Sequence, residues 1–171
     1  MNAVMIDNAQ LERELKKAHI TLMRNPETRL YAGVIMLGES KIVDDVPTAC
    51  TDGVNKLYGR EFMSGLTQPE MCGVVLHEAL HVALKHLYRH SDLMKDDPRV
   101  ANAAMDYVVN DVIHSLTDYG KWIVLPKIAL WDIKFRGWSV RDVYNFLKKG
   151  KDKDGKQHER KEKPQSGQGQ P

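Results

Sequence analysis

The residues with the clearest chemical signature form the pentad His77-Glu78-Ala79-Leu80-His81, an H-E-x-x-H pattern. Two histidines four residues apart lie on one face of an α-helix, separated by about 40° around its axis. Their imidazole nitrogens can hold one Zn²⁺ together, and the adjacent Glu78 can take a proton from a metal-bound water. Zinc lowers the pKa of that water toward about 7, so hydroxide forms at neutral pH. The pattern therefore predicts two metal ligands and a general base.

An apolar helix is predicted to carry this pentad. Thr67 and Glu70 have the spacing of a capping box, and Pro69 falls in the first turn, where its missing N–H costs nothing. The helix is predicted to run to about Arg89, because no proline follows up to that point, and its residues are apolar on nearly every side. Because polar side chains in a buried helix need a partner, the histidine pair is interpreted as a metal site. The alternative is a pair of core histidines held by backbone and carboxylate hydrogen bonds.

A catalytic zinc usually has three protein ligands, of which the pentad supplies two. Asp106 is the preferred third ligand, because it shares a helical face with Val109 and Ile113, which are expected to point inward. Asn102 and Asn110 lie one turn on either side and can orient its carboxylate. The alternative is that Asp106 caps a neighbouring loop or pairs with a histidine. Four further candidates are expected to point elsewhere: His86, His90, Asp111 and His114.

Periodicity and turn signals predict the elements that precede the pentad. Residues 8–23 carry apolar side chains at helical spacing and are expected to form a helix. Residues 30–37 are apolar enough for a strand that is buried on both faces. Residues 48–58 are expected to form a hairpin that turns at an Asp-Gly pair.

Two further helices are predicted after the pentad, over residues 99–116 and over residues 140–149, the second capped by Ser139. This order of elements indicates an α+β, zincin-like domain. A small antiparallel sheet packs on the buried H-E-x-x-H helix, and a second helix carries a ligand. The edge strand of the sheet is expected beside the metal helix, where it can pair with an extended peptide.

Composition divides the chain near residue 148. Residues 1–147 are expected to form one domain with its own core. Residues 148–171 contain no aliphatic or aromatic residue, methionine or cysteine, but eight Lys or Arg and four Asp or Glu. They are predicted to be a disordered, polar, basic tail. The acids among its lysines indicate a solvated tail, and no basic stripe with aromatics marks the rest of the sequence, so no nucleic-acid partner is expected.

The sequence predicts neither a membrane segment nor a disulfide framework. No apolar run approaches the ~18–20 residues that span a bilayer. Residues 1–7 lack the basic and apolar regions of a secretory signal. The two cysteines, Cys50 and Cys72, are expected to be small core residues. A reducing cytoplasm is the expected location.

Several segments resemble a known family. They are Asp52-Gly53 to Phe62-Met63, the pentad with Val82 to Leu87, Asn102-x-x-x-Asp106-Tyr107-x-x-Asn110, Leu125-Pro126, and Ser139 to Tyr144. Over about residues 5–147 the chain resembles the putative metallopeptidase domain that precedes a von Willebrand A-like domain in bacterial and phage proteins. The resemblance implies a zincin-like fold, with His77, His81 and Asp106 as zinc ligands and Glu78 as base. For longer relatives it also implies a partner ATPase.

Two classes of function fit the sequence. The leading hypothesis is a zinc-dependent peptidase, a hydrolase acting on a peptide or protein substrate, in which Glu78 accepts the proton of the attacking water. The alternative is a non-catalytic zinc-binding module for protein interaction. Glu78 favours the enzyme, because a structural zinc site has four closed protein ligands and needs no base.

Overall fold

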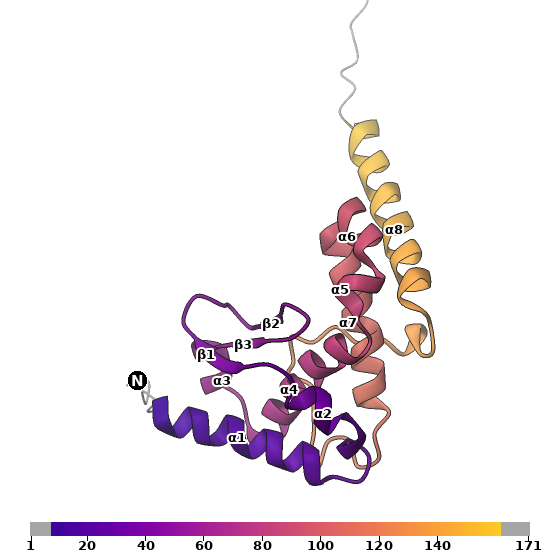
Figure 1. Ribbon diagram of the computed structural model, residues 1–171. Coiled ribbons are helices and arrows are strands. Elements are labelled where there is room, and N and C mark those ends of the chain that lie inside the picture. Colours follow the sequence, from indigo (N-terminus) through magenta and orange to yellow (C-terminus); the bar gives the residue numbers. More distant parts are fainter. Residues whose placement is uncertain (1–7, 162–171) are drawn as a thin grey trace, which may run out of the picture.

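A long helix, α4 (Gln68–Ala83), forms the centre of the computed structural model, which describes residues 8–161. The capping box predicted from the sequence is present, with the backbone N–H of Thr67 donating to Glu70 Oε2 at 2.8 Å. In Figure 1, α1 and the sheet lie on one side of α4, and α5 to α8 lie on the other. None of the helices within residues 8–161 is long and apolar enough to cross a membrane.

The first helix, α1 (Asn8–Arg24), confirms the sequence prediction. Its buried side chains belong to the same apolar cluster as those of α4 and are Leu11, Leu15, Ala18 and Leu22.

The strand predicted over residues 30–37 is wrong, because a short 3₁₀ turn, η1 (Arg29–Tyr31), and α2 (Ala32–Ile35) form there. A short apolar run does not distinguish a strand from a buried helix by periodicity alone. The buried Lys56 ammonium contacts this helical segment, because it donates to the carbonyls of Val34, at 2.9 Å, and Leu37. Val34 lies in α2 and Leu37 just after it, and the Val34 carbonyl also accepts from the backbone N–H of Leu37 at 3.2 Å.

A mixed three-stranded sheet lies beside α4, with strand order β1-β3-β2. The hairpin is confirmed, because β2 (Ala49–Thr51) pairs antiparallel with β3 (Lys56–Gly59). Its predicted tight Asp52-Gly53 turn is wrong: Thr51 pairs with Lys56, so the turn covers residues 52–55. Asp52 Oδ1 closes the turn by accepting from the backbone N–H of Asn55 at 2.7 Å. The wholly antiparallel sheet is wrong, because β1 (Ser40–Val43) joins β3 in parallel. The fold class is therefore α+β, with β2 at one edge of the sheet.

The pentad helix is shorter than predicted. It ends near Lys85, whose φ of 52° lies in the left-handed region, instead of continuing to Arg89. The predicted helix over residues 99–116 is confirmed as α7 (Pro98–His114). Besides η1 and α2, the described residues form four short helical elements: α3 (Arg60–Ser64), α5 (His86–Arg89), α6 (Ser91–Asp96) and η2 (Ile133–Phe135).

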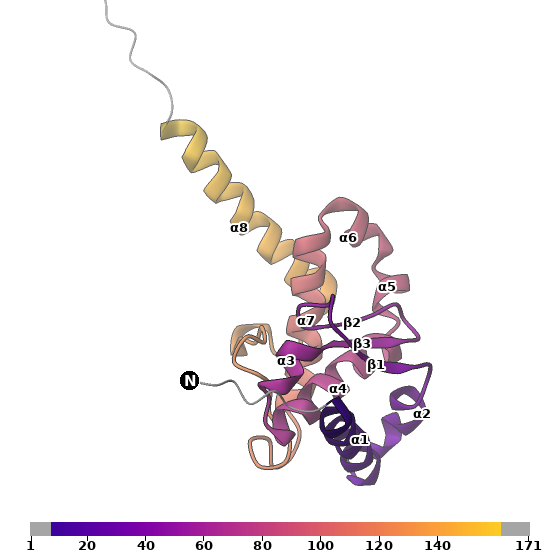
Figure 2. The same ribbon diagram turned by 90° about the vertical axis from the view of Figure 1, so that its left-hand side faces the viewer.

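The last helix, α8 (Val140–Lys161), begins as predicted, since Ser139 Oγ accepts from the backbone N–H of Asp142 at 3.2 Å. It continues past Lys149, so residues 148–161 of the predicted disordered tail are helical. Charged residues at helical spacing can continue a helix without a core. Figure 2 shows this part of α8 projecting from the rest of the fold. Residues 162–171 of the predicted tail lie outside the described residues.

Candidate metal centre

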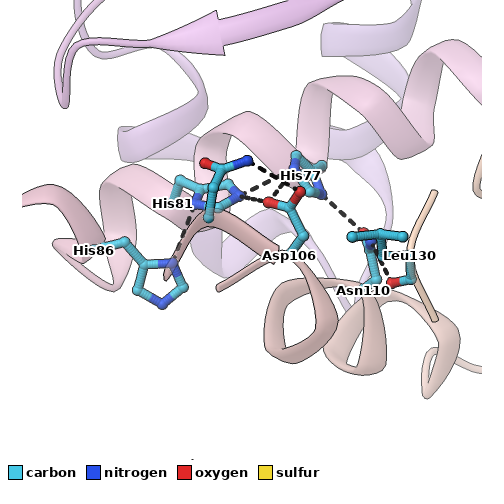
Figure 3. A network of polar contacts seen from close by, with 7 residues as sticks. His77, His81, His86, Asp106, Asn110 and Leu130 are labelled. Carbon is cyan, nitrogen blue, oxygen red and sulfur yellow. Dashed lines mark hydrogen bonds and ion pairs between the residues drawn. The ribbon is translucent and has the colours of Figure 1, made fainter. Parts of the chain in front are cut away.

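The three residues predicted as metal ligands meet between α4 and α7 (Figure 3). His77 Nε2 and His81 Nε2, one turn apart on α4, are 3.0 Å from each other. Asp106 Oδ1, from α7, lies 3.6 Å from His77 Nε2 and 3.2 Å from His81 Nε2. The sequence therefore identified three side chains that the fold brings together. Their binding of a metal stays a prediction.

The distances and the donor types fit zinc. Ligand atoms bound at about 2.0–2.1 Å around a tetrahedral zinc lie about 3.3 Å from one another. The separations of 3.0, 3.2 and 3.6 Å bracket that value. Two imidazole nitrogens and one carboxylate oxygen are donors that catalytic zinc sites use. The arrangement therefore matches three corners of a zinc site.

Asn110, on α7, sets the orientation of the His77 ring. Its amide Nδ2 donates to the Leu130 carbonyl at 2.9 Å, which leaves its Oδ1 as an acceptor. That oxygen lies 2.8 Å from His77 Nδ1, so His77 carries its proton on Nδ1. The lone pair of His77 Nε2 is then available toward His81 and Asp106. We expected Asn110 to orient the Asp106 carboxylate, but it orients a histidine.

His86 contacts the site, although its helical spacing from His77 predicts that it faces away. It is 2% exposed, and its Nδ1 lies 3.1 Å from His81 Nδ1. In an uninterrupted helix, residues five positions apart lie about 140° from each other around the axis. The left-handed residue Lys85 ends α4 and turns His86 back toward His81. Burial, assisted by the neighbouring His81, lowers the pKa of His86 to about 3.

The other candidate ligands lie outside the cluster, as predicted. Asp111 accepts from Arg136 Nε at 3.3 Å and from the backbone N–H of Gly137 at 3.2 Å, which fastens the loop before α8. The His114 ring stacks on Trp131 at 3.8 Å between centroids. Among the described residues, the metal-ligating atoms that converge within 4.8 Å belong to His77, His81 and Asp106.

Glu78 is buried beside the candidate ligands and is 5% exposed. Burial raises the pKa of its carboxyl group to about 7, against the opposing effect of the nearby His81 and Lys56. Asp106 raises the pKa of Glu78 as well. A carboxyl group with a pKa near neutrality can both accept and return a proton.

A cavity of about 320 Å³ opens over these residues. Its lining includes His77, Glu78, His81 and Asp106 on one side and all three residues of β2 on another. Cys50, in β2, is exposed, so its prediction as a core residue is wrong, whereas Cys72 is buried as predicted.

The segment from Leu125 to Leu130 forms a further wall of the cavity. Gly73 lets this segment approach α4, since a Cβ there would lie 2.2 Å from the Val124 carbonyl oxygen. The backbone N–H of Val124 donates to the Pro69 carbonyl at 3.1 Å, and the Leu130 carbonyl accepts from Asn110. The wall is therefore attached to both helices that carry the candidate ligands, α4 and α7.

Comparison with known proteins gives one match. No curated protein and no solved structure matches the chain. A family model with the description "Putative metallopeptidase domain" matches residues 10–171. The match begins within α1, includes α4 and α7, and extends beyond residue 147, where the sequence analysis ended the domain. The chain belongs to the Putative metallopeptidase domain family.

Proposed function

We propose that the chain is a zinc-dependent peptidase with a zincin-like site. His77, His81 and Asp106 hold the zinc ion, and Glu78 is the general base. The observation that carries this proposal is the convergence of three ligand atoms within 4.8 Å on a cavity that Glu78 also lines. Membership of a metallopeptidase family supports it.

Zinc bound at this site supplies a positive charge that polarises the substrate carbonyl and lowers the pKa of a water molecule. Glu78 accepts a proton from the attacking water and returns it to the nitrogen of the leaving amine. Burial favours this role, because it raises the pKa of Glu78 toward that of the water it deprotonates. Asn110 keeps the His77 ring oriented while the substrate reacts.

The substrate is proposed to be an extended peptide segment that pairs with β2. This strand lies at an edge of the sheet and lines the cavity beside the ligands. Backbone groups on a sheet edge can hydrogen-bond an added strand, while neighbouring pockets receive its side chains. Phe62, Leu125 and Ile128 line the same cavity and favour apolar side chains there.

The substitution Glu78→Gln tests the proposed chemistry. Glutamine has nearly the same size but cannot accept a proton at neutral pH, so cleavage of a broad peptide library should fall by at least about 100-fold. Zinc content by elemental analysis should stay at that of the parent, because Glu78 is not a ligand. Glu61→Gln is the matched control, since Glu61 is exposed on α3.

The possible results separate the two classes of function. Cleavage retained in Glu78→Gln would exclude Glu78 as the base. A parent protein that binds zinc but cleaves no library peptide would favour a non-catalytic zinc-binding interaction module.

A further inference from the structure

His86 makes a contact that neither the metallopeptidase assignment nor the ligand set explains. Its Nδ1 lies 3.1 Å from His81 Nδ1, on the side of the His81 ring that faces away from Asp106. The two rings meet edge to face, with 5.0 Å between centroids and 81° between planes. His86 is 2% exposed, so water does not compete for this contact.

The position of the His81 ring determines which nitrogen carries the shared proton. Two ring nitrogens at hydrogen-bond distance share one hydrogen, so one donates and the other accepts. His81 Nε2 faces His77 Nε2 and Asp106 Oδ1 and needs its lone pair to bind a cation. A neutral imidazole then carries its proton on Nδ1. His81 Nδ1 is therefore the donor, and His86 Nδ1 is the acceptor.

We propose that His86 is a positioning residue that accepts the Nδ1 proton of His81 and keeps the His81 Nε2 lone pair directed at the metal site. The proposal rests on the metal site described under the proposed function, but not on peptidase activity. The same molecule shows the same device at the other histidine, where Asn110 Oδ1 accepts from His77 Nδ1 at 2.8 Å. Hydrogen-bond partners of this kind fix the tautomer and the ring orientation of metal-binding histidines.

Two substitutions separate the acceptor from the bulk of the His86 side chain. His86→Leu keeps an apolar side chain in the buried site but removes the acceptor. His86→Asn keeps an acceptor, because its Oδ1 is bonded to Cγ as Nδ1 is in histidine. The control is His19→Leu, since His19 lies on α1 and bonds the Leu15 carbonyl and Ser40.

The measurement is zinc affinity, by competition with a chromogenic chelator at fixed pH. His86→Leu should bind zinc about 10–100-fold more weakly, and His86→Asn should stay within about threefold of the parent. His19→Leu should bind as the parent does. Equal affinities of the parent and His86→Leu, or equal weakening by Leu and Asn, would overturn the proposal.

Nitrogen NMR of the zinc-loaded parent shows which ring nitrogens of His81 and His86 carry a proton. It needs no substitution, so a variant that fails to fold cannot affect the result. With histidine labelled by ¹⁵N and the signals assigned, His81 should carry its proton on Nδ1, and His86 should carry its proton on Nε2. A proton on His86 Nδ1 would overturn the proposal. A parent that takes up no zinc would overturn this proposal together with the metal site. Zinc binding without peptide cleavage would contradict only the peptidase function.

Discussion

His77 and His81 are one helical turn apart on α4, but different parts of the molecule hold their rings. The partner of His77 is Asn110 on α7, 33 residues further along the chain. The partner of His81 is His86, five residues along, beyond the left-handed turn at Lys85. The His77 side of the site therefore depends on the packing of two helices, and the His81 side depends on a local turn.

The site therefore depends on the position of α7 more than on the turn at Lys85. Helix α7 carries Asp106 and Asn110 one turn apart, so the same helix supplies one proposed ligand and the hydrogen-bond partner of another. A shift of α7 against α4 would change both contacts together. A change at Lys85 would affect the His81 side alone.

The largest effect is expected at Asp106, because its carboxylate lies close to both His77 Nε2 and His81 Nε2. Asp106→Ala should weaken zinc binding by more than about 100-fold, because loss of a ligand's partner alone already costs about 10–100-fold. Zinc titration measures the change. Asp111→Ala, on the same helix, should bind zinc as the parent does, because Asp111 bonds Arg136 and Gly137. Equal loss in both variants would place the third ligand elsewhere.

The next largest effect is expected at Asn110. Asn110→Leu removes the acceptor of His77 and the donor to the Leu130 carbonyl, so zinc affinity should fall by about 10–100-fold. The free energy of unfolding should fall by about 1–3 kcal/mol, because buried polar groups lose their partners. Asn145→Leu is the matched control, since Asn145 is exposed on α8 and does not line the cavity. Chemical denaturation and zinc titration of both variants would show whether α7 supports His77 as described.

A smaller effect is expected at Lys85. Lys85→Ile places a β-branched residue at a φ of 52°, which should cost about 1–2 kcal/mol of stability. Because this turn brings His86 to His81, zinc affinity should also fall, but by less than in Asn110→Leu. Lys85→Gly should keep both the stability and the affinity, because glycine adopts this conformation without strain. A Gly variant as weak as the Ile variant would show that the lysine side chain matters more than the turn.

The sequence predicted local features of the site, but it missed several contacts between distant segments. The pentad and Asp106 could be identified because the spacing of residues on a helix determines which side chains share a face. Thr67 and Glu70 could be identified because a capping box is a local signal. These predictions needed no knowledge of how the helices pack.

The failures involve contacts between segments or the interruption of a helix. The strand over residues 30–37 is wrong because a short apolar run fits a strand and a buried helix equally well. The contact of Lys56, far along the chain, with the Val34 and Leu37 carbonyls has no signal in that run. His86 was placed away from the site because α4 was assumed to continue, and a left-handed lysine carries no strong sequence signal. The acceptor role of Asn110 toward His77 depends on the α4–α7 packing, which spacing along one helix does not determine.

The smallest effect is expected from removal of residues 150–171, which lie beyond both supports of the site. The buried side chains of the first turns of α8 are Val140, Val143 and Tyr144, and Lys148 Nζ lies 3.0 Å from Asp96 Oδ2. A chain that ends at Lys149 keeps all of these contacts. The removed residues contain no Ala, Val, Ile, Leu, Met, Phe, Trp, Tyr or Cys, so the melting temperature should change by less than about 2 °C. Zinc affinity should equal that of the parent, because His77, His81 and their partners are retained. A loss of several degrees with unchanged zinc affinity would show that this segment stabilises the domain. Weaker zinc binding at an unchanged melting temperature would show that the His77 and His81 sides share a third support in the removed segment.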